Sequence, residues 1–194
     1  MKLKTNIAIF ASGSGTNAQR IAEYFSGNPN VNIQLILSNK ADAYVMERAK
    51  MLNIPSVVFT AKEFRETTHV LEILKENEID FIVLAGFLLL LPAYLIQAFP
   101  NKIINIHPAL LPKYGGKGMY GHFVHEAVIA SGDAESGISI HYVNEKYDEG
   151  NIIFQALCPV LAGDTPDTLA TRIHELEYQY YPVVIEKLVE DTLP

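Results

Sequence analysis

The stretch Asn105-Ile106-His107-Pro108-Ala109-Leu110-Leu111-Pro112 follows the apolar run Lys102-Ile103-Ile104. Its β-branched residues suit a short buried strand, whereas the two prolines remove backbone donors and fix φ, so the strand must stop here. The side chains of Asn105 and His107 are two residues apart, and in an extended chain such side chains project from the same face. The stretch therefore predicts an amide and an imidazole that face one space at the end of a strand.

This pair of side chains has a chemical and a structural interpretation. An amide donor beside an imidazole suits a carbonyl oxygen that becomes negative during a reaction, and His107 can also carry a proton. In the structural interpretation, Asn105 forms a turn and His107 is a polar residue satisfied at the strand end. The octet alone leaves both interpretations open.

Outward from this stretch, short apolar runs alternate with longer amphipathic stretches, which is typical of an α/β fold whose mostly parallel sheet is covered by helices. We expect strands at 6–11, 32–37, 56–59, 81–85, 103–105, 138–143 and 152–160. We expect helices from residue 16, over 41–52, from 60 through 74, after 92, over 119–131 and over 166–189. No linker or repeat interrupts the pattern, so one domain over residues 1–194 is expected.

Helix caps support these assignments. Thr16 with Gln19, and Thr60 with Glu63, have the spacing of a capping box. Thr165 can cap the last helix, because a proline follows it at the first helical position.

The composition limits the possible partners. The 194 residues are 49% hydrophobic with a formal net charge of −7, and an acidic chain lacks the electrostatic footprint that holds a phosphate backbone. Cys158 is the only cysteine, which excludes an intrachain disulfide and a multi-cysteine zinc site. The longest apolar run, 81–91, is too short to cross a bilayer. We therefore expect no nucleic acid, no membrane and a cytoplasmic location.

The first expected strand leads into the glycine-rich loop Ser12-Gly13-Ser14-Gly15-Thr16-Asn17-Ala18. Its G-x-G-x-x-A spacing matches a dinucleotide site, but such a site needs an acid after the second strand, where this chain has Ser38-Asn39-Lys40. Backbone amides at a helix start can still attract a single anion such as a phosphate. We expect Gly15, Thr16 and Asn17 to hold it, and the alternative for Thr16 is a simple helix cap.

Two acids could belong to the same site. Asp148 lies in the loop before the last expected strand, where a solvated acid is the structural interpretation. If it reaches His107, its charge raises the imidazole pKa, while desolvation lowers that pKa. Glu177 lies on the C-terminal helix, either on a solvated face or in contact with a substrate amine.

The chain has five further histidines besides His107. His122 and His125 have H-x-x-H spacing, but a third ligand is lacking, so packing or loop hydrogen bonds are favoured and no metal is expected. His141 is expected to be structural or to support residues of the site. His69 and His174 give no signal beyond a helix surface.

Four motifs resemble the phosphoribosylglycinamide formyltransferase family in order and separation, over essentially the whole chain. They are Ser12-Gly13-Ser14-Gly15-Thr16-Asn17, Leu84-Ala85-Gly86-Phe87, the octet 105–112 and Asp148-Glu149-Gly150, of which the last two are the most specific. The resemblance implies a single-domain, Rossmann-like formyltransferase fold with a twisted sheet and helices on both faces. It also implies transfer of a formyl group from 10-formyltetrahydrofolate to the amine of glycinamide ribonucleotide, in purine biosynthesis.

The resemblance also implies residue roles. Catalysis falls to Asn105, His107 and Asp148, while the ribonucleotide phosphate would lie on Gly15, Thr16 and Asn17 and its amine would meet Glu177. The folate would lie along Leu88, Leu89, Leu90 and Leu91, largely on their backbone, and beside Asn105. A cis peptide bond is implied at Leu111-Pro112.

The chain departs from the family at the folate pocket. Leu89 stands where many relatives have arginine, so no polar side-chain contact is expected there. Lys62 or Arg65 could meet the glutamate tail of the folate, and the sequence does not decide between them.

The implied mechanism follows from the charges. The neutral amine attacks the formyl carbon, and Asn105 with a protonated His107 stabilises the oxyanion. Asp148 keeps His107 charged and, with water, helps to relay a proton to the leaving folate nitrogen. No metal or redox cofactor is needed.

Three rival functions share this fold. Formyltetrahydrofolate hydrolases use the same three residues with water as acceptor, but they carry an extra domain that is not expected here, because the first strand starts almost at Met1. Methionyl-tRNA formyltransferases add a C-terminal domain and meet an RNA. A non-catalytic nucleotide-binding module is the third rival. We expect small-molecule substrates only, and a monomer or weak homodimer.

Overall fold

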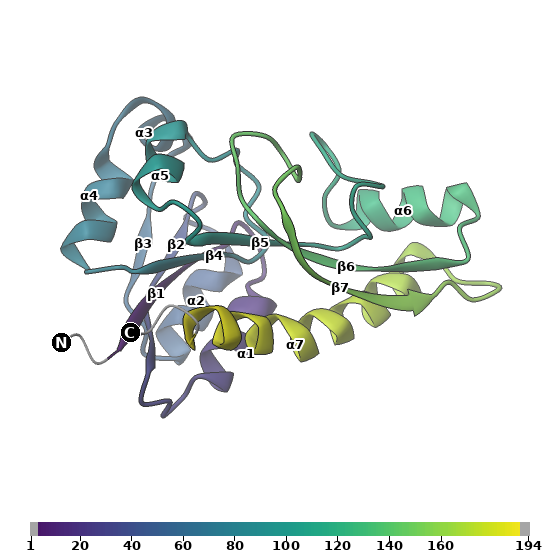
Figure 1. Cartoon of the computed structure of the whole chain (residues 1–194), viewed down its shortest axis with the longest axis horizontal. Helices are drawn as coiled ribbons and strands as arrows, with labels where there is room; N and C mark the ends of the chain where they lie inside the picture. Colours follow the sequence, from purple (N-terminus) through teal and green to yellow (C-terminus); the bar gives the residue numbers. More distant parts are fainter. Residues whose placement is uncertain (1–3, 191–194) are drawn as a thin grey trace.

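A mixed sheet with the strand order β3-β2-β1-β4-β5-β6-β7 runs through the protein (Figure 1). The computed structural model describes residues 4–190. Strands β1 to β5 pair in parallel and the last two are antiparallel, which confirms the expected α/β class. The strands are β1 Thr5–Phe10, β2 Val31–Ser38, β3 Ser56–Val58, β4 Phe81–Leu84, β5 Ile103–His107, β6 Glu135–Tyr142 and β7 Ile152–Pro159.

Helices cover both faces of this sheet. They are α1 Thr16–Tyr24, α2 Tyr44–Met51, α3 Ala61–Glu66, α4 His69–Glu76, α5 Ala93–Ala98, α6 His122–Ser131 and α7 Pro166–Glu190. Successive residues of a strand point to opposite faces, and β1 shows this clearly. Its Ile7 and Ile9 belong to the hydrophobic cluster that includes α1, α2 and α7, whereas Ala8 and Phe10 belong to the cluster with α3, α4 and α5.

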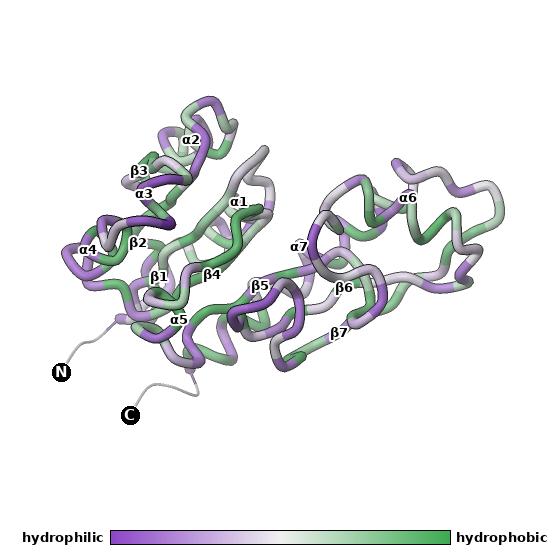
Figure 2. Tube along the Cα trace, turned by 90° about the horizontal axis from the view of Figure 1, so that it is seen from above, coloured by the Kyte–Doolittle hydropathy of each residue, from purple (hydrophilic) through white to green (hydrophobic). Residues whose placement is uncertain are grey.

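Hydrophobic residues are concentrated along the central strands β1 and β4, and hydrophilic residues are frequent along α3 and α4 (Figure 2). This distribution explains why strand-length apolar runs located the strands correctly. No helix within residues 4–190 is long and apolar enough to cross a membrane. The expected single domain over 1–194 stays a prediction, because residues 1–3 and 191–194 lie outside the described part.

The single helix expected from residue 60 through 74 is wrong. Thr60 and Glu63 form the expected capping box, but the helix ends at Glu66, and two residues separate it from the start of α4 at His69. Thr67 is extended, with φ −133° and ψ 169°, and its hydroxyl donates to the Glu63 carbonyl and accepts from the His69 amide. Such side-chain bonds compete with helical ones and end the helix.

The capping box expected at Thr16 and Gln19 is also wrong. The residue before α1 is Gly15, with φ 74°, and no side chain caps the helix start. At the last helix, the Thr165 hydroxyl accepts from the Thr168 amide at 3.3 Å, as expected of a cap before Pro166.

Two helices start later than expected, at Tyr44 instead of residue 41 and at His122 instead of 119. Gly118 and Gly121 both have positive φ, 88° and 50°, so the chain between them cannot be helical. The Leu111-Pro112 peptide bond is cis, as the family resemblance implied.

The carboxyl ends of β1, β4 and β5 meet at one edge of the sheet. The strand order reverses next to β1, where β2 lies on one side and β4 on the other. In open α/β sheets, ligands bind in the crevice at such a reversal. The loops after β1 and β4 are tied together there, because the Ser12 amide donates to the Gly86 carbonyl at 3.0 Å.

We predict that Gly137→Ala lowers the free energy of unfolding by about 3 kcal/mol or more, because overpacking a closed site forces the backbone to shift. A Cβ at Gly137 in β6 would overlap the Ala156 carbonyl oxygen of β7 and lie 2.7 Å from Leu110 Cδ2. Urea denaturation measures the change. Gly13→Ala is the control, because Gly13 has nothing within 4 Å of its would-be Cβ, and equal losses in both variants would contradict the prediction.

Candidate active site

A cavity of about 520 Å³ opens at the carboxyl ends of β1, β4 and β5. Several loops and residues of the helices α1, α6 and α7 form its wall, and they come from distant parts of the sequence. The wall comprises residues 13–17, 85–88, 105–108, 116–121 and 147–148, together with His125, His174 and Glu177. Three of the four motifs of the sequence line this cavity directly, and the fourth contributes Asp148.

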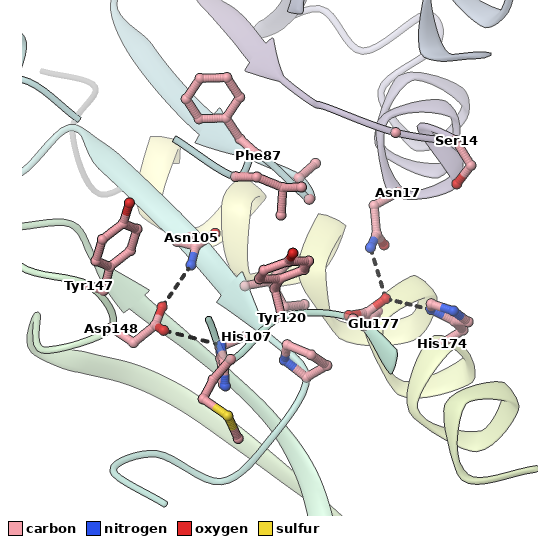
Figure 3. Close-up of a pocket in the computed structure, with 18 of the residues that line it drawn as sticks. Ser14, Asn17, Phe87, Asn105, His107, Tyr120, Tyr147, Asp148, His174 and Glu177 are labelled. Atoms are coloured by element: carbon pink, nitrogen blue, oxygen red, sulfur yellow. Dashed lines mark hydrogen bonds and ion pairs between the residues drawn. The ribbon is translucent and has the colours of Figure 1, made fainter. Parts of the chain in front are cut away.

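Asn105, His107 and Asp148 meet on one side of this cavity (Figure 3). Asp148 Oδ2 lies 3.5 Å from His107 Nδ1, and Asp148 Oδ1 lies 3.5 Å from Asn105 Nδ2. The Gly116 amide also donates to Oδ2 at 3.0 Å. The interpretation of Asp148 as a solvated loop acid is therefore wrong, and the carboxylate joins three segments of the chain.

Two opposing effects act on the charge state of His107. Burial lowers the pKa of the imidazole below its ordinary value of 6.5, and this effect exceeds that of the nearby Asp148 charge, which raises the pKa. His107 Nε2 donates to the Tyr114 carbonyl oxygen at 2.7 Å, because a carbonyl can only accept. The lowered pKa favours a neutral imidazole near pH 7, whereas a protonated ring would donate to both acceptors, the Tyr114 carbonyl and Asp148. The expected protonated His107 therefore stays a prediction.

Asp148 is ionised in the same environment. Burial raises the pKa of its carboxyl group, but the nearby His141 and His107 imidazoles and the Gly116 amide together lower it further than burial raises it. The net pKa lies below the ordinary value of 3.8. The cavity thus holds a buried negative charge beside two imidazole rings.

His141, on β6, supports this group from the neighbouring strand. Its Nδ1 donates to the Tyr142 carbonyl at 2.8 Å, which leaves Nε2 to accept from Asn105 Nδ2 at 3.2 Å. The same Nε2 lies 3.6 Å from Asp148 Oδ1. The sequence left His141 as structural or supporting, and its contacts favour the supporting role.

Gly15, Thr16 and Asn17 form the opposite side of the cavity. A Cβ at Gly15 would overlap the Val45 side chain, and its positive φ also favours glycine. Because no side chain caps α1, the amides of its first turn remain open toward the cavity. Such amides favour an anion, so the geometry agrees with the expected phosphate site.

Glu177 is 5% exposed and faces the same cavity from α7. Tyr181 lies one turn later on the same helix face and anchors α7 to the sheet, because its hydroxyl donates to the Leu84 carbonyl at 2.9 Å. Glu177 Oε2 accepts from Asn17 Nδ2 at 2.9 Å and contacts His174 Nδ1 at 2.9 Å (Figure 3). The interpretation of Glu177 as a solvated acid is therefore wrong.

His174 is a site residue that the sequence interpretation missed. Its hydrogen bond to Glu177 raises the pKa of the imidazole above 6.5 and outweighs the opposing effect of burial. The signal was present in the sequence, since a histidine three residues before a glutamate can pair with it on a helix.

The expected folate segment lies only partly in the cavity wall. Of Leu88, Leu89, Leu90 and Leu91, Leu88 lines the cavity, and Leu91 is buried in the core. The amides of Leu89 and Leu90 donate to no group within residues 4–190, so they are free to contact a ligand. The folate contacts of Leu88 to Leu91 stay predictions. Lys62 and Arg65, between which the sequence did not decide, both lie on α3 outside the cavity wall.

The H-x-x-H pair separates on α6. His122 is exposed and lies 3.2 Å from Glu126 Oε1, whereas His125 is buried and belongs to the cavity wall. Within the described residues, no group of three or more histidine, cysteine, aspartate or glutamate side chains is arranged to hold a metal ion. His125 is a second site residue that the sequence did not identify.

Comparisons with known proteins agree with this geometry. A family model described as "Formyl transferase" matches residues 5–185. The chain is 42% identical to the chloroplastic phosphoribosylglycinamide formyltransferase of Arabidopsis thaliana, over 98% of this chain and 67% of that protein. It is 41% identical to the Haemophilus influenzae phosphoribosylglycinamide formyltransferase, over 96% of this chain and 88% of that one. The crystal structure of phosphoribosylglycinamide formyltransferase from Streptococcus pneumoniae TIGR4 is similar, with a TM-score of 0.84 and 39% identity, over 95% and 98% of the two chains.

We predict that Glu177→Gln lowers the pKa of His174 toward 6.5, because the variant removes the negative partner of the imidazole. In the unmodified protein this pair stabilises the fold fully below pH 6.5, and the contribution is lost as pH rises through the raised pKa. NMR titration of the His174 ring protons measures both values. An unchanged pKa in the variant would contradict the pairing.

Proposed function

Because the chain belongs to the formyl transferase family, we propose that it transfers the formyl group of 10-formyltetrahydrofolate to the amine of glycinamide ribonucleotide, in purine biosynthesis. The observation that carries this proposal is one cavity that holds the Asn105, His107 and Asp148 group opposite an open helix start. The two ends of the cavity suit the two ends of a phosphorylated amine.

The ribonucleotide is placed by charge. Its phosphate binds the first-turn amides of α1, at Gly15, Thr16 and Asn17, where an anion is favoured. Its amine is directed by Glu177, whose Oε2 is already held by Asn17 and His174. The second carboxylate oxygen, Oε1, remains for the amine.

The reaction begins with the neutral amine attacking the formyl carbon of the folate. A C–N bond forms, the carbonyl electrons move onto oxygen, and Asn105 donates a hydrogen bond to the resulting oxyanion. The ammonium that develops loses a proton toward Asp148, directly or through water. The tetrahedral adduct then collapses, the C–N bond to the folate breaks, and the leaving nitrogen receives that proton.

His107 starts this sequence neutral, and its role follows from that state. A negative oxygen forming in the cavity favours a positive charge nearby, so the imidazole pKa rises as the adduct forms. Both ring nitrogens already face protein groups, the Tyr114 carbonyl and Asp148. His107 therefore stabilises the adduct by its charge, and direct donation to the oxyanion requires the bond to Tyr114 to break.

A hydrolase on the same fold would use water in place of the amine. Such an enzyme needs no anion site for an acceptor, yet the open start of α1 and the buried Glu177 both belong to this cavity. These features favour transfer to a phosphorylated amine. A formyl-transfer assay with and without glycinamide ribonucleotide separates the two, because a hydrolase releases formate without the acceptor.

A cytoplasmic location and a monomeric or weakly dimeric state remain part of this proposal. They are consistent with small-molecule substrates that diffuse freely. The Arabidopsis relative is named chloroplastic, so relatives of this chain differ in location.

We predict that Asp148→Asn leaves the fold intact and lowers turnover by about 100-fold or more, because the amide cannot accept the migrating proton or stabilise a charged His107. Steady-state kinetics measure the loss, and circular dichroism checks the fold. Glu149→Gln is the matched control, since Glu149 is the exposed neighbour that pairs with Lys146. Near-normal turnover of Asp148→Asn would count against the proton route.

We predict that Asn105→Ala lowers the maximal rate by about 100- to 1000-fold, because the oxyanion loses a hydrogen-bond donor in the transition state. The KM for the folate should change little. Asn77→Ala, at the end of α4 and remote from the cavity, is the control. A variant that loses folate affinity at an unchanged maximal rate would contradict the oxyanion role.

A further inference from the structure

His125 is a buried histidine on α6 that has no role in the proposed chemistry. Its side chain lies in the wall of the cavity, and the residue is only 2% exposed. Its Nδ1 atom is buried without a hydrogen-bond partner, and Nε2 has no partner within residues 4–190 either. Buried polar atoms are nearly always paired in folded proteins, so this orphaned ring calls for an explanation.

The environment of His125 keeps it neutral. Burial is the largest cause and His174 the second of a pKa lowered to about 4, while Glu177 acts in the opposite direction. His122 and His107 also lower it. At neutral pH the ring therefore carries one N–H group and one bare nitrogen.

The position of that proton follows from the surroundings of the ring. Nδ1 is buried and has no acceptor beside it, so a proton on Nδ1 would leave a buried N–H group without a hydrogen bond, which is costly. The proton is therefore assigned to Nε2, which leaves Nδ1 bare. His125 presents a neutral N–H donor to the cavity, and no protein group accepts from it.

We propose that His125 binds the ribonucleotide directly, by donating a hydrogen bond from Nε2 to a substrate oxygen located between the phosphate and the amine. This inference rests on the proposed function and identifies a further substrate-binding residue for it. The unpaired donor in the free protein is then explained, because its acceptor belongs to the substrate.

The location within the substrate follows from the neighbours of His125. His125 shares the cavity wall with His174 and Glu177 of α7 and with His107 of β5. Glu177 is itself bonded to Asn17 of the phosphate cradle. His125 thus lies between the cradle and the reacting centre, and a neutral donor there suits a sugar hydroxyl or the amide carbonyl.

Two variants separate this role from a packing role. His125→Leu removes the donor and also the unpaired Nδ1, so it should weaken substrate binding while it stabilises the fold. His125→Gln keeps an N–H near the position of Nε2 and should restore binding. If His125 only packed α6 against the protein, His125→Leu would not weaken substrate binding while it stabilised the fold.

The experiment is calorimetric titration of the full chain with glycinamide ribonucleotide in the absence of folate. His125→Leu should weaken Kd by about 3- to 10-fold, the value of one neutral hydrogen bond, and His125→Gln should return it to within about 2-fold. The Tm of His125→Leu should rise by about 2–4 °C. His122→Leu, the same change at an exposed position of α6, should leave Kd unchanged.

A second titration with ribose 5-phosphate identifies the acceptor. Loss of affinity for both ligands places the bond on a sugar hydroxyl, and loss for the full ribonucleotide alone places it on the amide carbonyl. An unchanged Kd in His125→Leu overturns the inference. Failure of the unmodified protein to bind the ribonucleotide at all would instead overturn the proposed function.

A measurement on the unmodified protein covers the case in which the variants fail to fold. Imidazole ¹⁵N NMR should show the His125 proton on Nε2 near pH 7, and saturation with the ribonucleotide should shift that resonance. A proton on Nδ1, or an Nε2 resonance that saturation leaves in place, overturns the inference.

Discussion

The contacts of the Asp148 carboxylate hold the site together. Its Oδ2 faces His107 of β5 and the Gly116 amide, and its Oδ1 faces Asn105 of β5 and His141 of β6. A buried charge is costly unless several donors surround it, so the loop around Asp148 can close only when both strands are in register. The antiparallel pairing of β5 with β6 supplies that register, because Asn105 pairs with His141.

Backbone strain accompanies this network. Tyr114 and Asp148 both have positive φ, 56° and 55°, although neither is glycine. Such conformations are uncommon for non-glycine residues and persist where the surroundings enforce them. Here the Tyr114 conformation directs its carbonyl toward His107, and its hydroxyl is fixed by a 2.8 Å bond to Asp133.

The sequence predicted the sheet and much of the site because both depend on local patterns. Apolar runs located each strand found within residues 4–190, and two prolines follow the strand that carries Asn105 and His107, as predicted. The break at Thr67 was missed because it depends on two side-chain bonds that no periodicity reveals. The charge state of His107 does not follow from the sequence, because burial and Asp148 shift its pKa in opposite directions and their balance depends on the folded structure.

The residues of α6 and α7 were also beyond the sequence. Helix spacing alone does not distinguish His125 and His174, which line the cavity, from the exposed His122, since all three are histidines on predicted helices. Which of them enters the cavity is decided by how the helices pack on the sheet. For α7 that packing is fixed by the buried hydroxyl of Tyr181, which bonds to the Leu84 carbonyl.

The bond between Asn17 and Glu177 links two parts of the cavity through a single residue. Asn17 belongs to the first turn of α1 by its backbone, and its side chain restrains the carboxylate of α7. A ligand that orders one end of the cavity therefore also orders the other end. For a ligand that contacts both ends, the entropic cost of immobilising these side chains arises only once. A ligand of different length would have to break the hydrogen bond between Asn17 and Glu177. The spacing of α1 and α7 therefore selects ligands by their length.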